Sequence, residues 1–305
     1  MEKERKEIII RMPNWIGDCI MAIPALKALS KQYSLTLAGK PWLAELFRGQ
    51  TFFNRIIPFR SFLSKLPPAE VGILFTNSFS SAFNFFISGV KKRIGYSTDL
   101  RKPLLTDPLK PPGKIHQVLQ YNRLAEYLIG KFNEDISLKI EKAQKDIDFI
   151  IIPGASKQAK RWGERRFRLL GEKLREKGFT ILYVGAKFEE ELIKRAAGNI
   201  PFSTPQLGEL PQLLARAKVV IGNDTGPIHL AAAVKTRVLV IFGPTDPSLT
   251  APWGQENSII YKKPECGPCH KSRCSSSKHI CMNSIKVEEV FERAVNILKR
   301  KPQHG

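Results

Sequence analysis

Two kinds of segment alternate along this chain of 305 residues: continuous apolar runs, and segments whose apolar residues recur at helical spacing. In the first part, strand-like runs lie at Glu7–Met12, Leu35–Ala38 and Val71–Thr76, and helical patterns follow at Ser80–Ile87 and Lys114–Ile129. Strands that read as continuous apolar runs are typical of parallel sheets buried on both faces. The pattern therefore predicts an α/β protein whose helices cover both faces of its sheets.

The same alternation restarts after Phe132–Ala143, a mixed segment that we interpret as a hinge region. The later strands are expected at Asp148–Ile152, Thr180–Val184, Val219–Gly222 and Val238–Phe242, with helices between them and a final helix at Val287–Lys299. Two doubly wound parallel sheets are therefore expected. The chain length suits two domains, which we place at residues 1–145 and 146–305.

The formal net charge of +21 is spread along the chain. Such a balance favours acidic partners: nucleic acid, an anionic membrane surface or phosphorylated substrates. A merely solvated basic surface is the alternative. Clustered cations interleaved with aromatic residues, which nucleic-acid binding favours, are not evident. The N-terminal residues do not resemble a secretory signal, and no apolar run reaches the roughly 20 residues of a membrane helix. We expect a cytosolic protein.

A turn between a predicted strand and a predicted helix carries the clearest site motif. It reads Asn-Asp-Thr-Gly-Pro-Ile-His and spans residues 223–229. A helix N-terminus binds anions through free N–H groups and its dipole. Gly226 allows close approach of the backbone, Thr225 offers a hydroxyl, and His229 lies one turn into the helix. Helix capping by Asp224 or Thr225, with His229 only packed, is the alternative.

Two further loops follow strands in the same way. Pro153-Gly-Ala-Ser156 is a small-residue loop near Lys160, whose charge can neutralise a departing nucleotide. A surface loop with solvated cations is the alternative. Asp18 stands at the start of the first helix, where a carboxylate can serve as a general base or simply favour the helix dipole. The Asp146-x-Asp148 pair has metal-binding spacing, but it lies at the entrance of a strand, so we reject it as a ligand site.

Four of the five cysteines lie close together, at Cys266, Cys269, Cys274 and Cys281. A C-x2-C pair followed by further cysteines can hold a structural Zn²⁺. Free thiols and disulfides are the alternatives, and a reducing cytosol disfavours disulfides. None of these states implies catalysis.

Together these motifs resemble glycosyltransferase family 9, the bacterial heptosyltransferases. The resemblance runs from about Ile8 to Leu298. Five stretches carry it: residues 11–18 with 22–25, residues 76–82, Pro153-Gly-Ala with Lys160-Arg-Trp162, residues 222–232, and Phe242-Gly-Pro-Thr-Asp246. The cysteine cluster also resembles one in the type II branch of that family.

The resemblance implies a GT-B fold, with two Rossmann-like domains facing a cleft, the acceptor in the first and the donor in the second. It implies inverting, metal-independent transfer of heptose from ADP-heptose to a phosphorylated inner-core acceptor of lipopolysaccharide. The implied roles are a general base at Asp18 and a cationic donor contact at Lys160. The implied donor contacts are Ser156, Glu189, Asp224, Thr225, Gly226 and His229.

The acceptor side is less defined. The candidate acceptor contacts are Asn77, Ser78, Arg93 and Arg101, since Arg grips phosphate through two hydrogen bonds, although surface charge is the alternative for the two arginines. We expect peripheral attachment to the anionic cytoplasmic face of the inner membrane. The rival functions are a related transferase of the family with another acceptor, such as the first heptosyltransferase, and a non-catalytic basic protein that binds nucleic acid.

Overall fold

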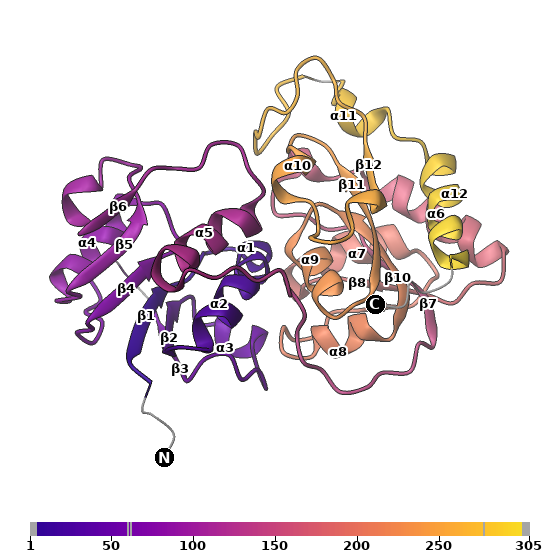
Figure 1. Cartoon of the computed structure of the whole chain (residues 1–305). Helices are drawn as coiled ribbons and strands as arrows, with labels where there is room; N and C mark the ends of the chain where they lie inside the picture. The colour runs from indigo at the N-terminus through magenta and orange to yellow at the C-terminus, as the bar shows by residue number, and fades with distance from the viewer. Residues whose placement is uncertain (1–4, 60, 62, 277, 301–305) are drawn as a thin grey trace. The chain divides into compact units, whose positions relative to one another are not determined.

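The structure is a computed structural model that describes residues 5–59, 61, 63–276 and 278–300 (Figure 1). The chain separates into two compact units, Met1–Ile136 and Ser137–Gly305. The division thus lies before the position that the sequence suggested. Residues 137–145 belong with the second unit because they bond to it: Leu138 N donates to Ala233 O (2.8 Å) and Lys145 Nζ to Ala217 O (2.7 Å).

The first unit contains a parallel sheet with the order β3-β2-β1-β4-β5-β6. Its strands are β1 (Glu7–Arg11), β2 (Ser34–Gly39), β3 (Arg55–Pro58), β4 (Val71–Leu74), β5 (Lys92–Tyr96) and β6 (Asp107–Leu109). Strands β1 and β4 are neighbours in the middle of the sheet. Strands β2 and β3, which follow β1 in the chain, lie on one side, and β5 and β6, which follow β4, lie on the other. In such sheets, ligands bind beyond the carboxyl ends of the strands at this switch point.

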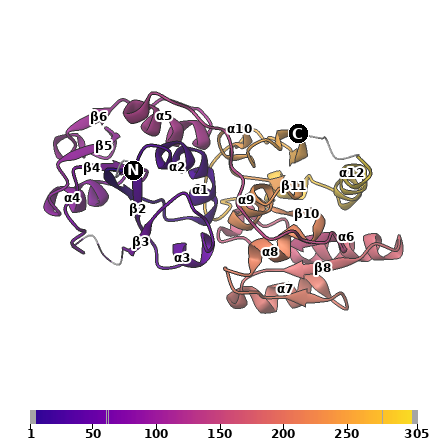
Figure 2. The same ribbon diagram turned by 60° about the horizontal axis from the view of Figure 1, so that its bottom comes forward.

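Helices cover both faces of the first sheet (Figures 1 and 2). They are α1 (Ile16–Met21), α2 (Ile23–Ser30), α3 (Leu43–Leu46), α4 (Phe79–Ile87) and α5 (Gln117–Ile129), with a 3-10 turn η1 (Lys102–Leu104). Helices α1, α2 and α5 lie on one face and α4 on the other (Figure 1). Alternate residues of a strand point to opposite faces of the sheet. Ile9 of β1 and Leu74 of β4 therefore pack with Phe85 of α4 in one buried cluster.

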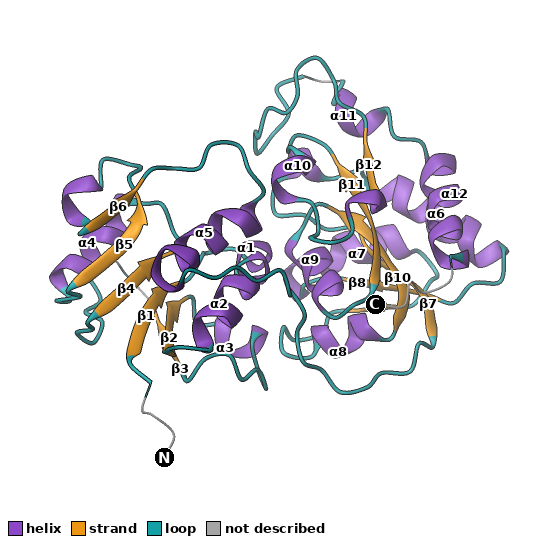
Figure 3. Ribbon diagram, viewed as in Figure 1, coloured by secondary structure: helices purple, strands orange, loops and turns teal. Residues whose placement is uncertain are grey.

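The second unit repeats this topology, with the order β12-β11-β10-β7-β8-β9 (Figure 3). Its strands are β7 (Ile147–Ile152), β8 (Ile181–Val184), β9 (Phe202–Ser203), β10 (Ala217–Asn223), β11 (Arg237–Phe242) and β12 (Ile259–Tyr261). All pairings are parallel. The prediction of two doubly wound α/β units is confirmed, and the second switch point lies between β7 and β10.

The helices of the second unit are α6 (Glu164–Glu176), α7 (Glu190–Ala197), α8 (Leu210–Ala215), α9 (Gly226–Ala233), α10 (Pro247–Thr250), α11 (Ile280–Asn283) and α12 (Val287–Lys299). In the parts of the chain described, no helix is both long and apolar enough to span a bilayer.

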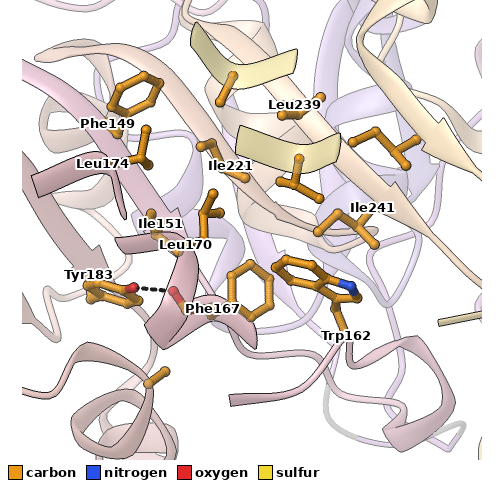
Figure 4. Close-up of a cluster of buried hydrophobic side chains, with 14 of the residues drawn as sticks. Phe149, Ile151, Trp162, Phe167, Leu170, Leu174, Tyr183, Ile221, Leu239 and Ile241 are labelled. Atoms are coloured by element: carbon orange, nitrogen blue, oxygen red, sulfur yellow. Dashed lines mark hydrogen bonds between the residues drawn. The ribbon is translucent and has the colours of Figure 1, made fainter. Parts of the chain in front are cut away.

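Trp162 anchors the loop after β7 to the core of the second unit (Figure 4). Its indole is fully buried and stacks edge-on against Phe167, and its Nε1 donates to Ile285 O at 3.0 Å. Nearby, Tyr183 Oη donates to Phe167 O at 2.6 Å, so this buried hydroxyl is satisfied as well. Because Trp162 is fixed, the residues just before it, including Lys160, are held at the carboxyl edge of the sheet.

Candidate active site

The end of β10 is tied to the end of β7 by one buried amide. Asn223 Nδ2 donates to Pro153 O at 2.8 Å, and Asn223 Oδ1 accepts from Trp162 N at 3.0 Å. Asn223 is fully buried, so losing these bonds would leave its polar atoms unsatisfied. The amide brings the two predicted donor loops together at the switch point.

Asp224 is the centre of a buried network in the next position. Its Oδ2 accepts from Lys160 Nζ at 2.6 Å and from Thr245 Oγ1 at 2.7 Å, and its Oδ1 lies 3.8 Å from His229 Nε2. Lys160 Nζ also donates to Asp224 O at 3.2 Å. An ammonium group has three protons, so one remains to donate to a ligand.

The charge of the Asp224 carboxylate is strongly favoured. Burial alone would raise its pKa, but the neighbouring His229 ring and the Lys160 ammonium outweigh burial and lower the pKa to about 2. The carboxylate is therefore ionised at any physiological pH. It orients Lys160 as a fixed cation at the edge of the sheet.

Helix α9 begins beside this network without a side-chain cap. Its N-cap residue Thr225 makes no capping hydrogen bond in the described structure, and its hydroxyl donates instead to Asn223 O at 3.2 Å. His229 Nδ1 is buried and, within the described residues, has no hydrogen-bond partner. Uncapped N–H groups and an orphaned buried nitrogen both fit a site that an anionic ligand completes.

Glu189 closes the other side of the β7 loop. A Cβ at Gly154 would lie 2.4 Å from Glu189 Oε1, so only glycine lets this carboxylate lie over the loop. The carboxylate can accept hydrogen bonds from the hydroxyls of a ribose. Ser156, in the same loop, is exposed. The structure thus places all six predicted donor contacts and Lys160 around the carboxyl ends of β7, β8 and β10.

Thr245 is a residue of this network that sequence reasoning missed. It follows β11, the strand beside β10, and is 8% exposed. The signal was present, since Phe242-Gly-Pro-Thr-Asp246 is one of the stretches that carry the family resemblance. Its hydroxyl fixes the Asp224 oxygen that also accepts from Lys160.

In the first unit, Asp18 lies in the first turn of α1, just beyond the carboxyl end of β1. The side chain is half-buried. The pKa of buried Tyr121 is raised well above its usual value, mainly by burial and next by the charge of Asp18. Asp18 thus keeps partial access to solvent at the edge of the sheet where a ligand would lie, which is the position that a general base needs.

Asn77 and Ser78 follow β4, the strand next to β1, so they share an edge of the sheet with Asp18. Ser78 caps α4 by accepting from Ser81 N. Arg101 is fully buried, and its guanidinium donates to Tyr96 O at 2.8 Å and to Thr76 O. It holds the loop that carries Asn77 rather than presenting a free guanidinium.

Arg93 is not brought together with the other candidates. It lies at the beginning of β5, the opposite edge of the sheet from Asp18 and Asn77. Its guanidinium donates to Leu104 O at 2.6 Å and to Val90 O at 2.6 Å. Burial lowers its pKa below the ordinary value.

The four clustered cysteines line one small pocket with His279. All are free thiols; Cys281 is buried and the other three are exposed. Over the residues that the structure describes, no group of three or more His, Cys, Asp or Glu side chains is arranged to hold a metal ion. The cysteine loop contacts the donor site: Ala159 N donates to Ser272 O at 3.0 Å, one residue before Lys160.

The chain is similar to known proteins in sequence and in fold. The model of "Glycosyltransferase family 9 (heptosyltransferase)" matches residues 64–280. "Lipooligosaccharide heptosyltransferase 2" of Campylobacter jejuni is 27% identical over 332 residues, covering 96% of this chain and 98% of that protein.

Two solved structures from Escherichia coli share the fold. ADP-heptose lps heptosyltransferase II has a TM-score of 0.77 at 20% identity, over 96% of this chain and 98% of its own. Heptosyltransferase WaaC with ADP has a TM-score of 0.75 at 18% identity, over 94% and 99%. These likenesses confirm the predicted GT-B fold. Because the family model matches well over half of the chain, the protein belongs to glycosyltransferase family 9, the heptosyltransferases, and is a sugar-transferring enzyme.

Proposed function

We propose that this enzyme transfers a heptose from ADP-heptose to the inner core of lipopolysaccharide, by inversion and without a catalytic metal. The observation that carries the proposal is the Lys160–Asp224–His229 network at the uncapped start of α9. It supplies fixed positive charge and backbone donors where a diphosphate would lie. The names of the relatives supply the sugar and the acceptor: ADP-heptose and lipopolysaccharide.

On the donor side, Lys160 and the first turn of α9 would bind the diphosphate, with Thr225 and Gly226 allowing its close approach. Ser156 is a further hydroxyl within this loop system. His229 Nδ1 would gain the hydrogen bond that it lacks in the described structure. Glu189 would accept from the ribose hydroxyls. The Lys160 ammonium, the hydroxyls and the backbone N–H groups of α9 are fixed cations and neutral donors, which stabilise developing charge without reorganisation.

The chemical step is a single displacement. Asp18 accepts the proton of an acceptor hydroxyl as that oxygen attacks the anomeric carbon. The bond from this carbon to the diphosphate oxygen breaks, and ADP leaves with the electron pair. The growing negative charge on the diphosphate is met by Lys160 and the α9 N-terminus. Attack on the face opposite the leaving group inverts the anomeric centre.

For the acceptor we propose contacts with Asn77 and Ser78, which share an edge with Asp18. Arg101 acts as a positioning residue, since its guanidinium holds the Thr76 carbonyl. Arg93 is left out of the reacting geometry because it lies at the far edge of the sheet.

We propose a structural Zn²⁺ at Cys266, Cys269, Cys274 and Cys281. The donor set supports it, since four thiols line one pocket and thiolates suit tetrahedral Zn²⁺. The four thiols would have to draw together to bind the ion. Metal analysis of the purified protein tests this proposal. One zinc per chain, lost in Cys266→Ser and kept in Cys19→Ser, is expected; metal-free wild-type protein would refute it.

We further propose that the enzyme works at the cytoplasmic face of the inner membrane, held by its basic surface against anionic lipid.

The test of the transfer itself is ADP release from ADP-heptose with two acceptors. Turnover on a heptose-primed acceptor and little on an unprimed one supports the second heptose addition; the reverse preference supports the first. Absence of ADP release with both acceptors contradicts the proposed function. Retention of random RNA on a filter at physiological salt would instead favour the nucleic-acid-binding alternative.

A further inference from the structure

Helix α4 turns an apolar face to solvent. Phe79 and Phe86 are 45% and 51% exposed, and Phe83 stacks on Phe79 with the ring centroids 6.3 Å apart. A surface helix ordinarily carries charged side chains on this face, yet no Asp, Glu, Lys or Arg occurs from Val71 to Val90. The opposite face of α4 is already satisfied by the buried cluster beneath it, so packing does not explain the outer phenylalanines.

Leu100 extends this face from the loop after β5. It is 91% exposed and has φ 55°, directly after Asp99 with φ 50°. A left-handed backbone is unfavourable for leucine, and an exposed leucine gains nothing from burial. The loop is nevertheless held firmly, because Asp99 Oδ2 accepts from Phe79 N at 2.6 Å and buried Arg101 donates to Tyr96 O. A large apolar side chain that is exposed, on a strained backbone held in place by hydrogen bonds, is typical of a functional contact.

Leu63 joins from the chain that precedes β4. It is 62% exposed, and the next residue, Ser64, accepts from Asn84 Nδ2 of α4 at 2.6 Å. We define the α4 surface as the apolar side chains of Leu63, Phe79, Phe83, Phe86 and Leu100. The helix that carries three of them lies on the face of the first sheet opposite α2 and α5 (Figure 1).

Basic residues border the α4 surface. The Arg93 guanidinium lies 5.4 Å from the centroid of the Phe86 ring, and exposed Lys102 begins η1, which packs against α4. Residues 61–110 contain seven Lys and Arg and three Asp and Glu, an excess of 7 − 3 = +4. Each of the three acids has a partner: Glu70 bonds to Lys91, Asp107 to Lys92 and Asp99 to the Phe79 N–H.

We propose that the α4 surface docks the protein on an anionic lipid bilayer. Its apolar tips enter the boundary between headgroups and acyl chains. Exposed Lys65, two residues after Leu63, contacts lipid phosphates together with Arg93 and Lys102. Charge complementarity selects this occupant, since an apolar face with a basic border matches an anionic bilayer. The inference rests on the proposed function, because Asn77 and Ser78 immediately precede α4 and a lipid-anchored acceptor must reach them at the membrane.

Sedimentation with lipid vesicles tests the surface. Vesicles of phosphatidylglycerol and phosphatidylethanolamine should bind the full-length protein, and vesicles of phosphatidylcholine alone should bind it weakly. Leu100→Gly should weaken partitioning about tenfold, the worth of one buried leucine side chain, without lowering the Tm, since glycine relieves the left-handed strain. Lys65→Glu and Lys102→Glu should each weaken it at least about fivefold.

Matched controls lie on α6 of the second unit and at its C-cap, Lys177. Leu169→Ser removes a 42% exposed leucine, and Arg175→Glu and Lys177→Glu reverse exposed charges; these should bind vesicles within about twofold of wild type. Wild-type protein that ignores anionic vesicles, or Leu100→Gly that binds like wild type, would overturn the proposal.

Turnover separates this inference from the proposed function. Leu100→Gly should keep wild-type turnover on a deacylated, water-soluble acceptor and lose it on the acceptor embedded in vesicles. Equal loss on both acceptors overturns the docking role. Vesicle binding as expected with no transfer to either acceptor contradicts the proposed function while supporting the docking surface.

Discussion

Thr245 Oγ1 donates to Asp224 Oδ2 at 2.7 Å across two adjacent strands. Asp224 follows β10 and Thr245 follows β11, so the bond joins two loops of the carboxyl edge. The same oxygen accepts from Lys160 Nζ at 2.6 Å. The hydroxyl therefore helps to fix the position of the carboxylate, which in turn positions the Lys160 ammonium.

Thr245→Val removes that hydroxyl and keeps the shape of the side chain. Losing a hydrogen bond to a charged group should raise the KM for ADP-heptose about tenfold, with a smaller effect on kcat. Steady-state kinetics at varied donor concentration measure this. Thr250→Val is the matched control, since Thr250 Oγ1 is buried and lacks a hydrogen-bond partner among the described residues. Equal KM values for Thr245→Val and wild type would contradict the positioning role.

Asp18→Asn tests the general base. It preserves the size of the side chain but cannot take up the acceptor proton, so kcat should fall about a hundredfold to ten-thousandfold while the donor KM stays near wild type. Glu45→Gln, which also neutralises an acid in the first turn of a helix of the first unit, should retain activity. Turnover of Asp18→Asn within about tenfold of wild type would rule out the assignment.

Gly154→Ala tests the placement of Glu189. The new Cβ would lie 2.4 Å from Glu189 Oε1, so the carboxylate must move and the donor KM should rise about tenfold. A double-mutant cycle supplies the control. In a Glu189→Ala background the Gly154→Ala change should have little further effect, since the contact it disturbs is already gone. Additive effects of the two substitutions would mean that the loop acts independently of Glu189.

The lowered pKa of Asp224 makes the free energy of unfolding depend on pH. Its folded pKa of about 2 lies below the unfolded value near 3.8, so its contribution is fully present above about pH 4 and is lost as pH falls through about 2. This contribution is on the order of 2–3 kcal/mol. Asp224→Asn should therefore lower the Tm by a constant amount from pH 5 to pH 7, and the difference should narrow below about pH 4. A Tm difference that grows on acidification would contradict the sign.

The fold was predictable from sequence where the strands are fully buried. β7, β10 and β11 are long apolar runs followed by glycine- or proline-bearing turns, and such runs leave little choice of structure. β3 and β6 were not predicted, since the sequences RIIP and DPL are short and combine charge with proline at the edges of the sheet.

The site was predictable only in part, because some of its contacts depend on how the strands are arranged in the sheet. Asp224 and Lys160 stand in motifs that follow strands, whereas the contact of Thr245 with Asp224 depends on which strands are neighbours. The sequence also could not distinguish Arg101, whose guanidinium is buried under the Thr76 carbonyl, from the more exposed Arg93. Arginine ordinarily lies at the surface, and its burial here follows from tertiary contacts that leave no periodic signal.

Removal of divalent ions tests the electrostatic basis of the mechanism. If Lys160 and the first turn of α9 stabilise the departing diphosphate, then enzyme dialysed against EDTA should keep its kcat within about twofold, and added Mg²⁺ or Mn²⁺ should not raise it. Zinc content must be measured in the same samples, because loss of a structural ion from the cysteine loop would disturb Ala159 and, beside it, Lys160. Lys160→Ala supplies the complementary change: its kcat should fall with or without Mg²⁺. An EDTA-treated enzyme that keeps its zinc, is inactive and recovers with Mg²⁺ alone would place a metal where we place the lysine.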